Sequence, residues 1–178
     1  MSSNFATIDA AIRRLESDSS EDRKHAREAL EAVGRPATGQ LVRFLKPAGP
    51  GARHEALRVL AAIGDPEALD TFVEHLDDEE SDCRWAAGEG LGKLGETGLR
   101  RVLEILLDPP GEEHQLRAVH HALDELSKAG FDSVARPVLL AFQSPRREVE
   151  LPTTAHTALE RLRHEAASEA ARAASGKG

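Results

Sequence analysis

Three segments of the chain align without gaps: residues 22–34 read DRKHAREALEAVG, residues 52–64 read ARHEALRVLAAIG and residues 83–95 read CRWAAGEGLGKLG. Gly34, Gly64 and Gly95 close the segments at intervals of 30 and 31 residues. In each segment an alanine and a leucine stand four residues apart: Ala26 and Leu30, Ala56 and Leu60, Ala87 and Leu91. This period predicts units that stack on their neighbours, and the glycine fits the C-terminus of a helix.

The repeating unit extends on both sides of these segments. Two weaker copies keep the apolar pattern but lose the arginine and the glycine: Val119, Ala122, Leu123 and Leu126, then Ala155, Ala158, Leu159 and Leu162. An amphipathic helix precedes each copy, with apolar pairs such as Ile8 and Ile12, Leu41 and Leu45, Phe72 and Leu76, and Leu99 and Leu103. The last of these helices, over 133–142, contains Pro137, which is expected to kink it.

This pattern predicts an all-α fold, a right-handed α-solenoid of about five helical hairpins. Each unit consists of a first helix, a polar loop, a second helix and a glycine turn, and only stacking buries its apolar stripe. We expect one domain over 1–165, with repeats near 5–34, 35–64, 65–95, 96–129 and 130–165. Residues 166–178 are rich in alanine and serine, and we expect a helix extension or a disordered tail there.

Composition limits the classes of function. The 178 residues carry a formal net charge of −8, which argues against binding to nucleic acid or to an anionic membrane surface. Aromatic residues make up only 3%, which favours helices over strands. Because Cys83 is the single cysteine, we expect neither an intramolecular disulfide nor a cysteine-based zinc site. The chain shows no long apolar run and no signal-peptide pattern, so we expect a cytoplasmic protein.

Two short motifs resemble HEAT repeats, in the short glycine-rich form that is also found in bilin lyases. Residues 64–69 (GDPEAL) look like that family's turn into a first helix, and residues 52–57 (ARHEAL) look like the opening of its second helix. The resemblance implies that Arg23, Arg53 and Arg84 tie adjacent repeats together through acidic loop residues. It also implies that the second helices line a concave surface that binds another protein, and it implies no reaction.

The second helices present two rows of side chains away from the predicted core. With Arg23, Arg53 and Arg84 as position zero and 100° per residue, positions one and five point into the groove. Position one holds Lys24, His54, Trp85 and Arg117, and position five holds Glu28, Arg58, Glu89 and His121. Together with Glu55, these residues form our candidate partner-binding groove.

Trp85 is the only tryptophan, and two interpretations of it are open. Tryptophan is enriched among binding hot spots because it buries a large apolar area. Alternatively, its ring lies over His54, Arg58 or Arg117 as a cation–π stack within the protein. The alternating charges of position five are likewise either inter-repeat ion pairs or a polar groove for a peptide or a folded partner.

An acidic run precedes the second helix of the third repeat: Asp77, Asp78, Glu79, Glu80 and Asp82. Carboxylates favour a helix N-terminus, so we interpret the run as a solvated capping loop. A basic partner or weak Ca²⁺ binding is the alternative. The spacing does not match an EF-hand loop, which needs a glycine at position six and a glutamate at position twelve.

Motifs for catalysis find little support. His54-Glu55 is similar to the His-Glu motif of deoxyhypusine hydroxylase, a HEAT-repeat enzyme with a di-iron centre, but the family carries four such pairs and the equivalent places here hold other residues. His120 and His121 are adjacent on a helix, so they point about 100° apart and do not face one metal. We therefore predict no cofactor, no metal and no catalytic residue.

The predicted function is a non-catalytic interaction module that binds a protein or peptide partner in the concave groove. The first alternative is a subunit or regulator of an enzyme complex, such as a bilin-lyase-like chaperone. A metal-dependent hydroxylase is the second. The pattern leaves open the oligomeric state, and whether the groove, the acidic loops or the tail is the main binding surface.

Overall fold

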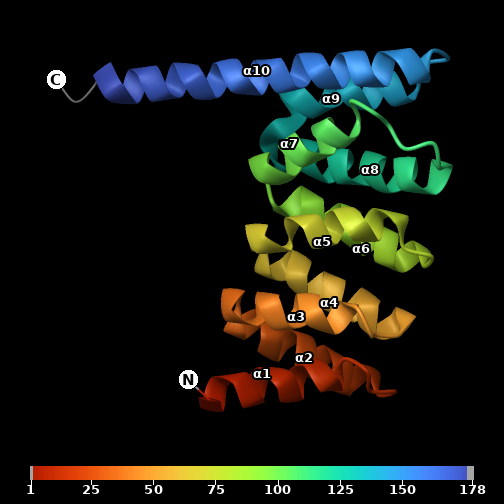
Figure 1. Ribbon diagram of the computed structural model, residues 1–178, viewed down its shortest axis with the longest axis vertical. Helices are drawn as coiled ribbons and strands as arrows, with labels where there is room; N and C mark the ends of the chain where they lie inside the picture. Colours follow the sequence, from red (N-terminus) through yellow and green to blue (C-terminus); the bar gives the residue numbers. More distant parts are fainter. Residues whose placement is uncertain (1, 176–178) are drawn as a thin grey trace.

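A computed structural model describes residues 2–175, and the chain forms an ordered stack of helical hairpins (Figure 1). The helices are α1 (Ser2–Arg14), α2 (Ser20–Val33), α3 (Thr38–Leu45), α4 (Pro50–Ile63), α5 (Leu69–Glu74), α6 (Ser81–Lys93), α7 (Glu96–Ile105), α8 (Glu113–Leu126), α9 (Asp132–Phe142) and α10 (Arg147–Ser175). This part of the chain contains no strand, and none of its helices is long and apolar enough to cross a membrane. The predicted all-α solenoid is confirmed.

The repeated alanines and leucines lie where the helical register predicts them. Ala56, Ala87, Leu60 and Leu91 are all fully buried in one core cluster that continues along the stack. The second helices α2, α4, α6 and α8 pack on one another in order. Burial of each alanine keeps neighbouring helices close, because its side chain adds little bulk between the backbones.

The glycine at the end of each strong repeat makes the turn into the next hairpin. The backbone φ angles of Gly34, Gly64 and Gly95 are 70°, 63° and 60°. Positive φ is costly for residues that carry a Cβ atom, so glycine ends these helices with the least strain. The recurrence of glycine every 30 or 31 residues therefore sets the length of the structural unit.

Three further glycines within α6 let this helix approach its neighbours. A Cβ atom on Gly88 would lie 2.8 Å from the backbone oxygen of Ala118, and one on Gly92 would lie 2.5 Å from Cβ of Glu125. Gly88 and Gly92 stand four residues apart, so they lie on the same face of α6, and this face packs against α8. Gly90 faces the other way, where its Cβ position is filled by the ring of Phe72. Helix α6 is thus packed tightly on two sides.

The fifth hairpin departs from the stacking of the others. Helix α10 packs mainly against α9 and α7, and its C-terminal part extends past the edge of the stack (Figure 1). Residues 166–168 and 170–173 are exposed, and residues 176–178 of the predicted tail over 166–178 lie outside the described part. The helix itself runs to Ser175.

Helix α9 includes Pro137 within its continuous span from Asp132 to Phe142. A proline leaves the carbonyl four residues earlier without its helical donor. Here that carbonyl belongs to Ser133, and it accepts a hydrogen bond of 3.0 Å from Nη1 of Arg161 on α10. Packing of the last hairpin therefore satisfies the group that the proline frees.

Candidate functional site

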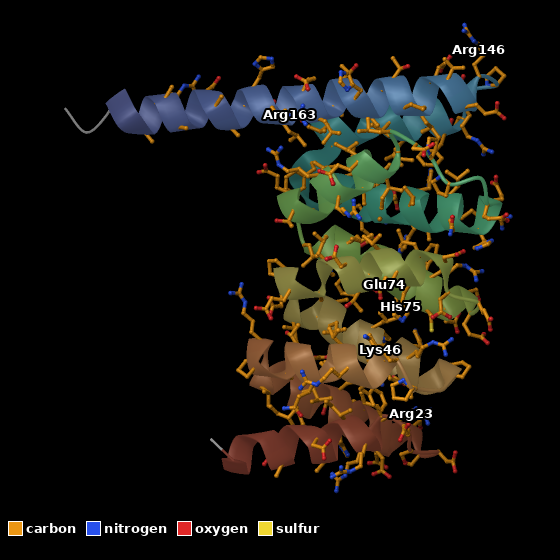
Figure 2. All side chains as sticks on the ribbon, viewed as in Figure 1. Arg23, Lys46, Glu74, His75, Arg146 and Arg163 are labelled. Atoms are coloured by element: carbon orange, nitrogen blue, oxygen red, sulfur yellow. The ribbon has the colours of Figure 1, made fainter. Side chains whose placement is uncertain are left out.

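The exposed sides of α2, α4, α6 and α8 form one surface, which we call the second-helix face. Most of the predicted groove residues lie on it: Lys24, Glu28, Arg58, Trp85 and Arg117 are exposed, and His54 and Glu89 are half-buried. Lys24 and Glu28 pair with each other along α2 at 3.8 Å. Figure 2 shows side chains with nitrogen and oxygen atoms along the whole length of the stack, so charge alone does not distinguish this face.

Trp85 stacks on His121 of the next hairpin. The ring centroids lie 3.4 Å apart and the ring planes differ by 14°. Trp85 remains 57% exposed, whereas His121 is only 7% exposed. The structure thus corrects two expectations: His121 is buried and does not face the open groove, and the side chain stacked on Trp85 is that of His121 and not that of His54, Arg58 or Arg117.

The glycine at position 88 explains why this histidine is buried. A Cβ atom there would lie 3.1 Å from Cδ2 of His121, so only glycine lets α8 bring the imidazole against α6. Burial lowers the pKa of His121, although the carboxylates of Glu125 and Glu89 act in the opposite direction. Its Nε2 atom is buried and has no hydrogen-bond partner among the described residues. The stack therefore holds a neutral imidazole at neutral pH.

A small hollow of about 170 Å³, which we call the Trp85 slot, opens between α6 and α8. Its walls are Ser81, Arg84, Trp85, His114, Arg117 and Ala118. Nη1 of Arg84 donates to the backbone oxygens of Asp78 and Glu79 at 2.7 and 2.9 Å. Nε2 of His114 lies 2.8 Å from Oδ1 of Asp77. The slot is therefore an apolar space with a cationic rim.

Glu55 does not belong to the open face, although it was among the predicted groove residues. It is 9% exposed and lies between the first and second hairpins. Its carboxylate accepts from Nη1 of Arg27 at 2.6 Å and from Nε of Arg23 at 3.3 Å. Nη1 of Arg58 lies 3.8 Å away. Because three arginines surround this carboxylate, it acts as an ion-pairing centre between repeats.

The three recurring arginines brace the stack. Each donates through Nη1 to a backbone oxygen of the loop before its own helix: Arg23 to Ser17, Arg53 to Ala48 and Arg84 to Asp78. Arg53 also donates twice to Asp78 in the next acidic loop, at 3.0 and 2.8 Å. The pKa of Asp78 is lowered: burial alone would raise it, but the hydrogen bonds from Arg53 and from the Glu80 amide outweigh burial. The tie between repeats that the resemblance implied is present at this joint.

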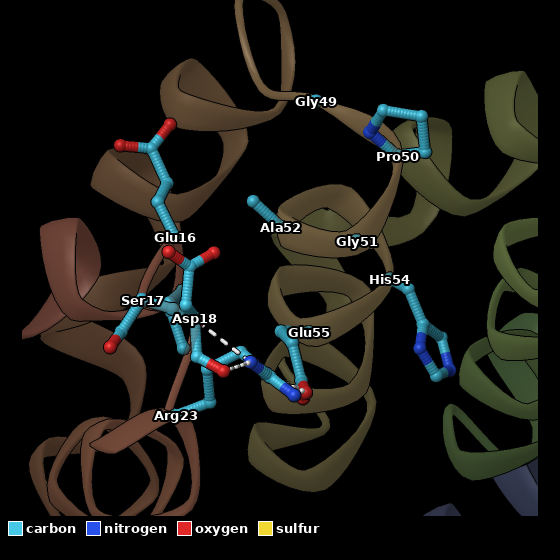
Figure 3. Close-up of a pocket in the computed structure, with 11 residues that line it drawn as sticks. Glu16, Ser17, Asp18, Arg23, Gly49, Pro50, Gly51, Ala52, His54 and Glu55 are labelled. Carbon is cyan, nitrogen blue, oxygen red and sulfur yellow. Dashed lines mark hydrogen bonds and ion pairs between the residues drawn. The ribbon is translucent and has the colours of Figure 1, made fainter. Parts of the chain in front are cut away.

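A larger open hollow of about 530 Å³ lies where the first two hairpins meet (Figure 3). Gly49 and Gly51 line it, and a Cβ atom on either would meet nothing within 4 Å. In Figure 3 Arg23 and Glu55 point toward each other, while His54 points away from them. The side chains of His54 and Glu55 therefore point in different directions, and the carboxylate of Glu55 is paired with Arg23 and Arg27.

The remaining residues considered for catalysis lie apart. His120 meets Phe142 edge-on, with ring centroids 5.0 Å apart, and so points away from the stacked ring of His121. Cys83 is buried, and burial raises the pKa of its thiol to about 11. Within residues that the structure describes, no three His, Cys, Asp or Glu side chains gather as metal ligands would.

Two comparisons of the sequence with known proteins agree with the stack of helical hairpins. Residues 40–124 match the family model of HEAT repeats, which spans the joints from the second hairpin to the fourth. Residues 40–124 therefore belong to the HEAT-repeat family. It is also similar to the phycocyanobilin lyase subunit beta of Nostoc sp., with 36% identity over 92 residues. That match covers 46% of this chain and 46% of the relative, so the chain spans less than half of the relative's length.

Proposed function

We propose that this protein is a non-catalytic interaction module that binds a protein or peptide partner on its second-helix face. Trp85 is the central anchor of this surface, with His54, Arg58, Glu89 and Arg117 around it. The partner is held by shape and charge complementarity on a surface that exists before binding.

The observation that carries the proposal is the exposure of Trp85 in a fixed orientation. A tryptophan that is 57% exposed leaves a large apolar area in water, and burial of apolar area by a partner is favourable. The stack on His121 holds the ring in one orientation, so little side-chain entropy is lost on binding. Tryptophans of this kind are frequent among the residues that dominate binding energy.

The residues around Trp85 support recognition of a polar partner. Arg58 is exposed and only loosely paired with Glu55 at 3.8 Å. Lys24 and Glu28 are exposed at the N-terminal end of the same face. A mixed rim around an apolar centre is the usual anatomy of a protein interface.

The test compares two single variants, Trp85→Ala and Leu140→Ala. Leu140 on α9 is 59% exposed and therefore matches Trp85 in exposure while lying away from the second-helix face. Partners are captured from the lysate of the source organism with wild type and both variants. We expect Trp85→Ala to weaken a specific partner by about 2 kcal/mol, or roughly 30-fold, and Leu140→Ala to leave it unchanged. Partners that all survive Trp85→Ala in a folded variant would refute the proposed site.

A second candidate is a subunit of a lyase complex, because the Nostoc relative is named as a subunit of phycocyanobilin lyase. Phycocyanobilin titrated into the purified protein provides the test. Saturable binding followed by the absorbance of the bilin, weakened in Trp85→Ala and unchanged in Leu140→Ala, would favour this candidate. Glu55 offers no support for a hydroxylase, since its carboxylate is occupied by Arg23 and Arg27.

A further inference from the structure

We propose that the Trp85 slot receives one apolar side chain from a partner segment that carries a carboxylate beside it, so that the partner is an acidic peptide segment. This inference rests on the proposed function and specifies its partner. It concerns the slot between α6 and α8 rather than the whole second-helix face.

The size of the slot fits a single side chain. Its volume is about 170 Å³, and one water in the liquid occupies about 30 Å³. The space therefore equals that of about five or six waters and suits one leucine-sized or phenylalanine-sized group. Trp85 and Ala118 are apolar lining residues, and arginine side chains such as those of Arg84 and Arg117 carry an aliphatic stem that can face an apolar space.

The charge at the rim determines the chemistry beside that side chain. Arg117 is exposed and makes no hydrogen bond or ion pair with the residues that the structure describes. Two acids beside the slot already have partners: Asp77 pairs with His114 at 2.8 Å, and Glu113 pairs with Arg147 at 3.1 Å. A free guanidinium next to an apolar slot is best matched by a carboxylate, which it can bind with two parallel hydrogen bonds.

The net charge of the chain, −8, does not oppose this partner at short range. At physiological ionic strength the Debye length is about 8 Å, so distant carboxylates are largely screened while a direct contact with Arg117 is not. Trp85 is also the only tryptophan, so its fluorescence reports on the slot itself.

The test begins with a displayed library of random twelve-residue peptides. Peptides are selected on the full-length wild-type protein after removal of those that bind Trp85→Ala. We expect the selected peptides to share an apolar residue next to Asp or Glu. Selection of basic or uncharged motifs, or no enrichment over Trp85→Ala, would overturn the proposal.

A charge reversal then tests the role of Arg117 with a matched control. Binding of one selected peptide is followed by Trp85 fluorescence in wild type, Arg117→Glu and Arg146→Glu. Arg146 is exposed in the loop between α9 and α10 (Figure 2) and does not line the slot, so its variant makes the same change of charge outside the slot. We expect at least a tenfold loss for Arg117→Glu, recovery when the acidic residue of the peptide is replaced by lysine, and no loss for Arg146→Glu.

Equal losses in the two charge reversals would show that only net charge matters, which overturns the proposal. This failure differs from failure of the proposed function. If captured partners are lost with Trp85→Ala but retained with Arg117→Glu, the second-helix face is still a binding surface and only the acidic partner is wrong.

Discussion

The joint between α2 and α4 and the joint between α6 and α8 solve the same packing problem with different chemistry. At the first joint the carboxylate of Glu55 binds the guanidinium groups of Arg23 and Arg27. At the later joint Gly88 and Gly92 bring two backbones together, and Trp85 covers the buried His121. One joint depends on charge and the other on close contact.

The difference shows that a shared repeat pattern does not prescribe a shared means of stacking. Ion pairs hold helices at a distance set by long side chains, and salt weakens them where they are partly exposed. Close backbone contact is insensitive to salt but tolerates no added atom. The two joints should therefore respond differently to salt, to pH and to small substitutions.

The largest effect is expected from filling the space between α6 and α8. Gly88→Ala combined with Gly92→Ala should lower the free energy of unfolding by about 3 kcal/mol or more, because both new Cβ atoms would overlap α8. Urea unfolding measures this change. Gly51→Ala is the control: its Cβ position is open, and the substitution should leave stability unchanged or raise it slightly. An unchanged double variant would contradict the close approach of α6 and α8.

Glu55→Gln should lower the free energy of unfolding by about 2 kcal/mol, since it removes the charged acceptor of two arginines. The loss should shrink in 1 M NaCl, where the Debye length is about 3 Å. Glu28→Gln provides the control, because the pair of Glu28 with Lys24 is exposed and contributes about 0–1 kcal/mol. A loss for Glu55→Gln that is the same in high salt would show that packing, and not charge, holds the first joint.

The joint between the second and third hairpins tests the charge mechanism by pH. Asp78→Asn should cost about 1.5 kcal/mol near pH 6, because an amide cannot accept both hydrogen bonds from Arg53 as a carboxylate does. The pKa of Asp78 is lowered in the folded protein, so its contribution is full above the ordinary value of 3.8 and is lost as pH falls through the lowered pKa. Denaturation series at several pH values should show wild type and Asp78→Asn converging in acid; a constant difference would argue against this linkage.

Trp85→Ala should have the smallest effect on stability, a loss of about 1 kcal/mol at pH 7 from the ring stack. It should also change the response to pH. The pKa of His121 is lowered from 6.5 in the folded protein. As pH falls below 6.5, the unfolded chain therefore binds a proton at this histidine before the folded protein does. The stability of the wild type falls over this range, down through the lowered pKa. Removal of Trp85 lets water reach His121 and should flatten this dependence. The pH series of His121→Gln, which lacks the titrating group, gives the reference slope; a slope in Trp85→Ala as steep as in wild type would contradict the shielding role.

The fold followed from the sequence because helical spacing fixes which side chains share a face. Ala56, Leu60, Ala87 and Leu91 are buried as their register predicted, and the glycine turns have positive φ. Helix periodicity is a local property, so it holds whatever the neighbouring hairpin does.

The burial of His121 was missed because periodicity gives the direction of a side chain but not the distance to the next helix. That distance depends on Gly88 and Gly92, which lie on the side of α6 that meets Ala118 and Glu125 of α8. Glycines four residues apart in a helix were the available signal for close approach.

Glu55 was misplaced for a different reason. The resemblance predicted that Arg23 would meet an acid in the next loop, as Arg53 meets Asp78. Residues 46–51, the loop before α4 and the first two residues of α4, read KPAGPG and hold no acid, so Arg23 pairs instead with Glu55 further along α4. The absence of an acid from residues 46–51 was the signal that the carboxylate partner of Arg23 had to lie outside this loop.

The overhang of α10 has a consequence for amide hydrogen exchange. Residues 166–168 and 170–173 are exposed, so the end of this helix depends on its own helical propensity, to which alanine contributes the most. Amides there should exchange by fraying at the helix end, whereas those in α4 and α6 should exchange only when the stack opens. A single molecule should thus show two exchange regimes, and the change from one to the other along α10 would mark where the stack stops protecting the helix.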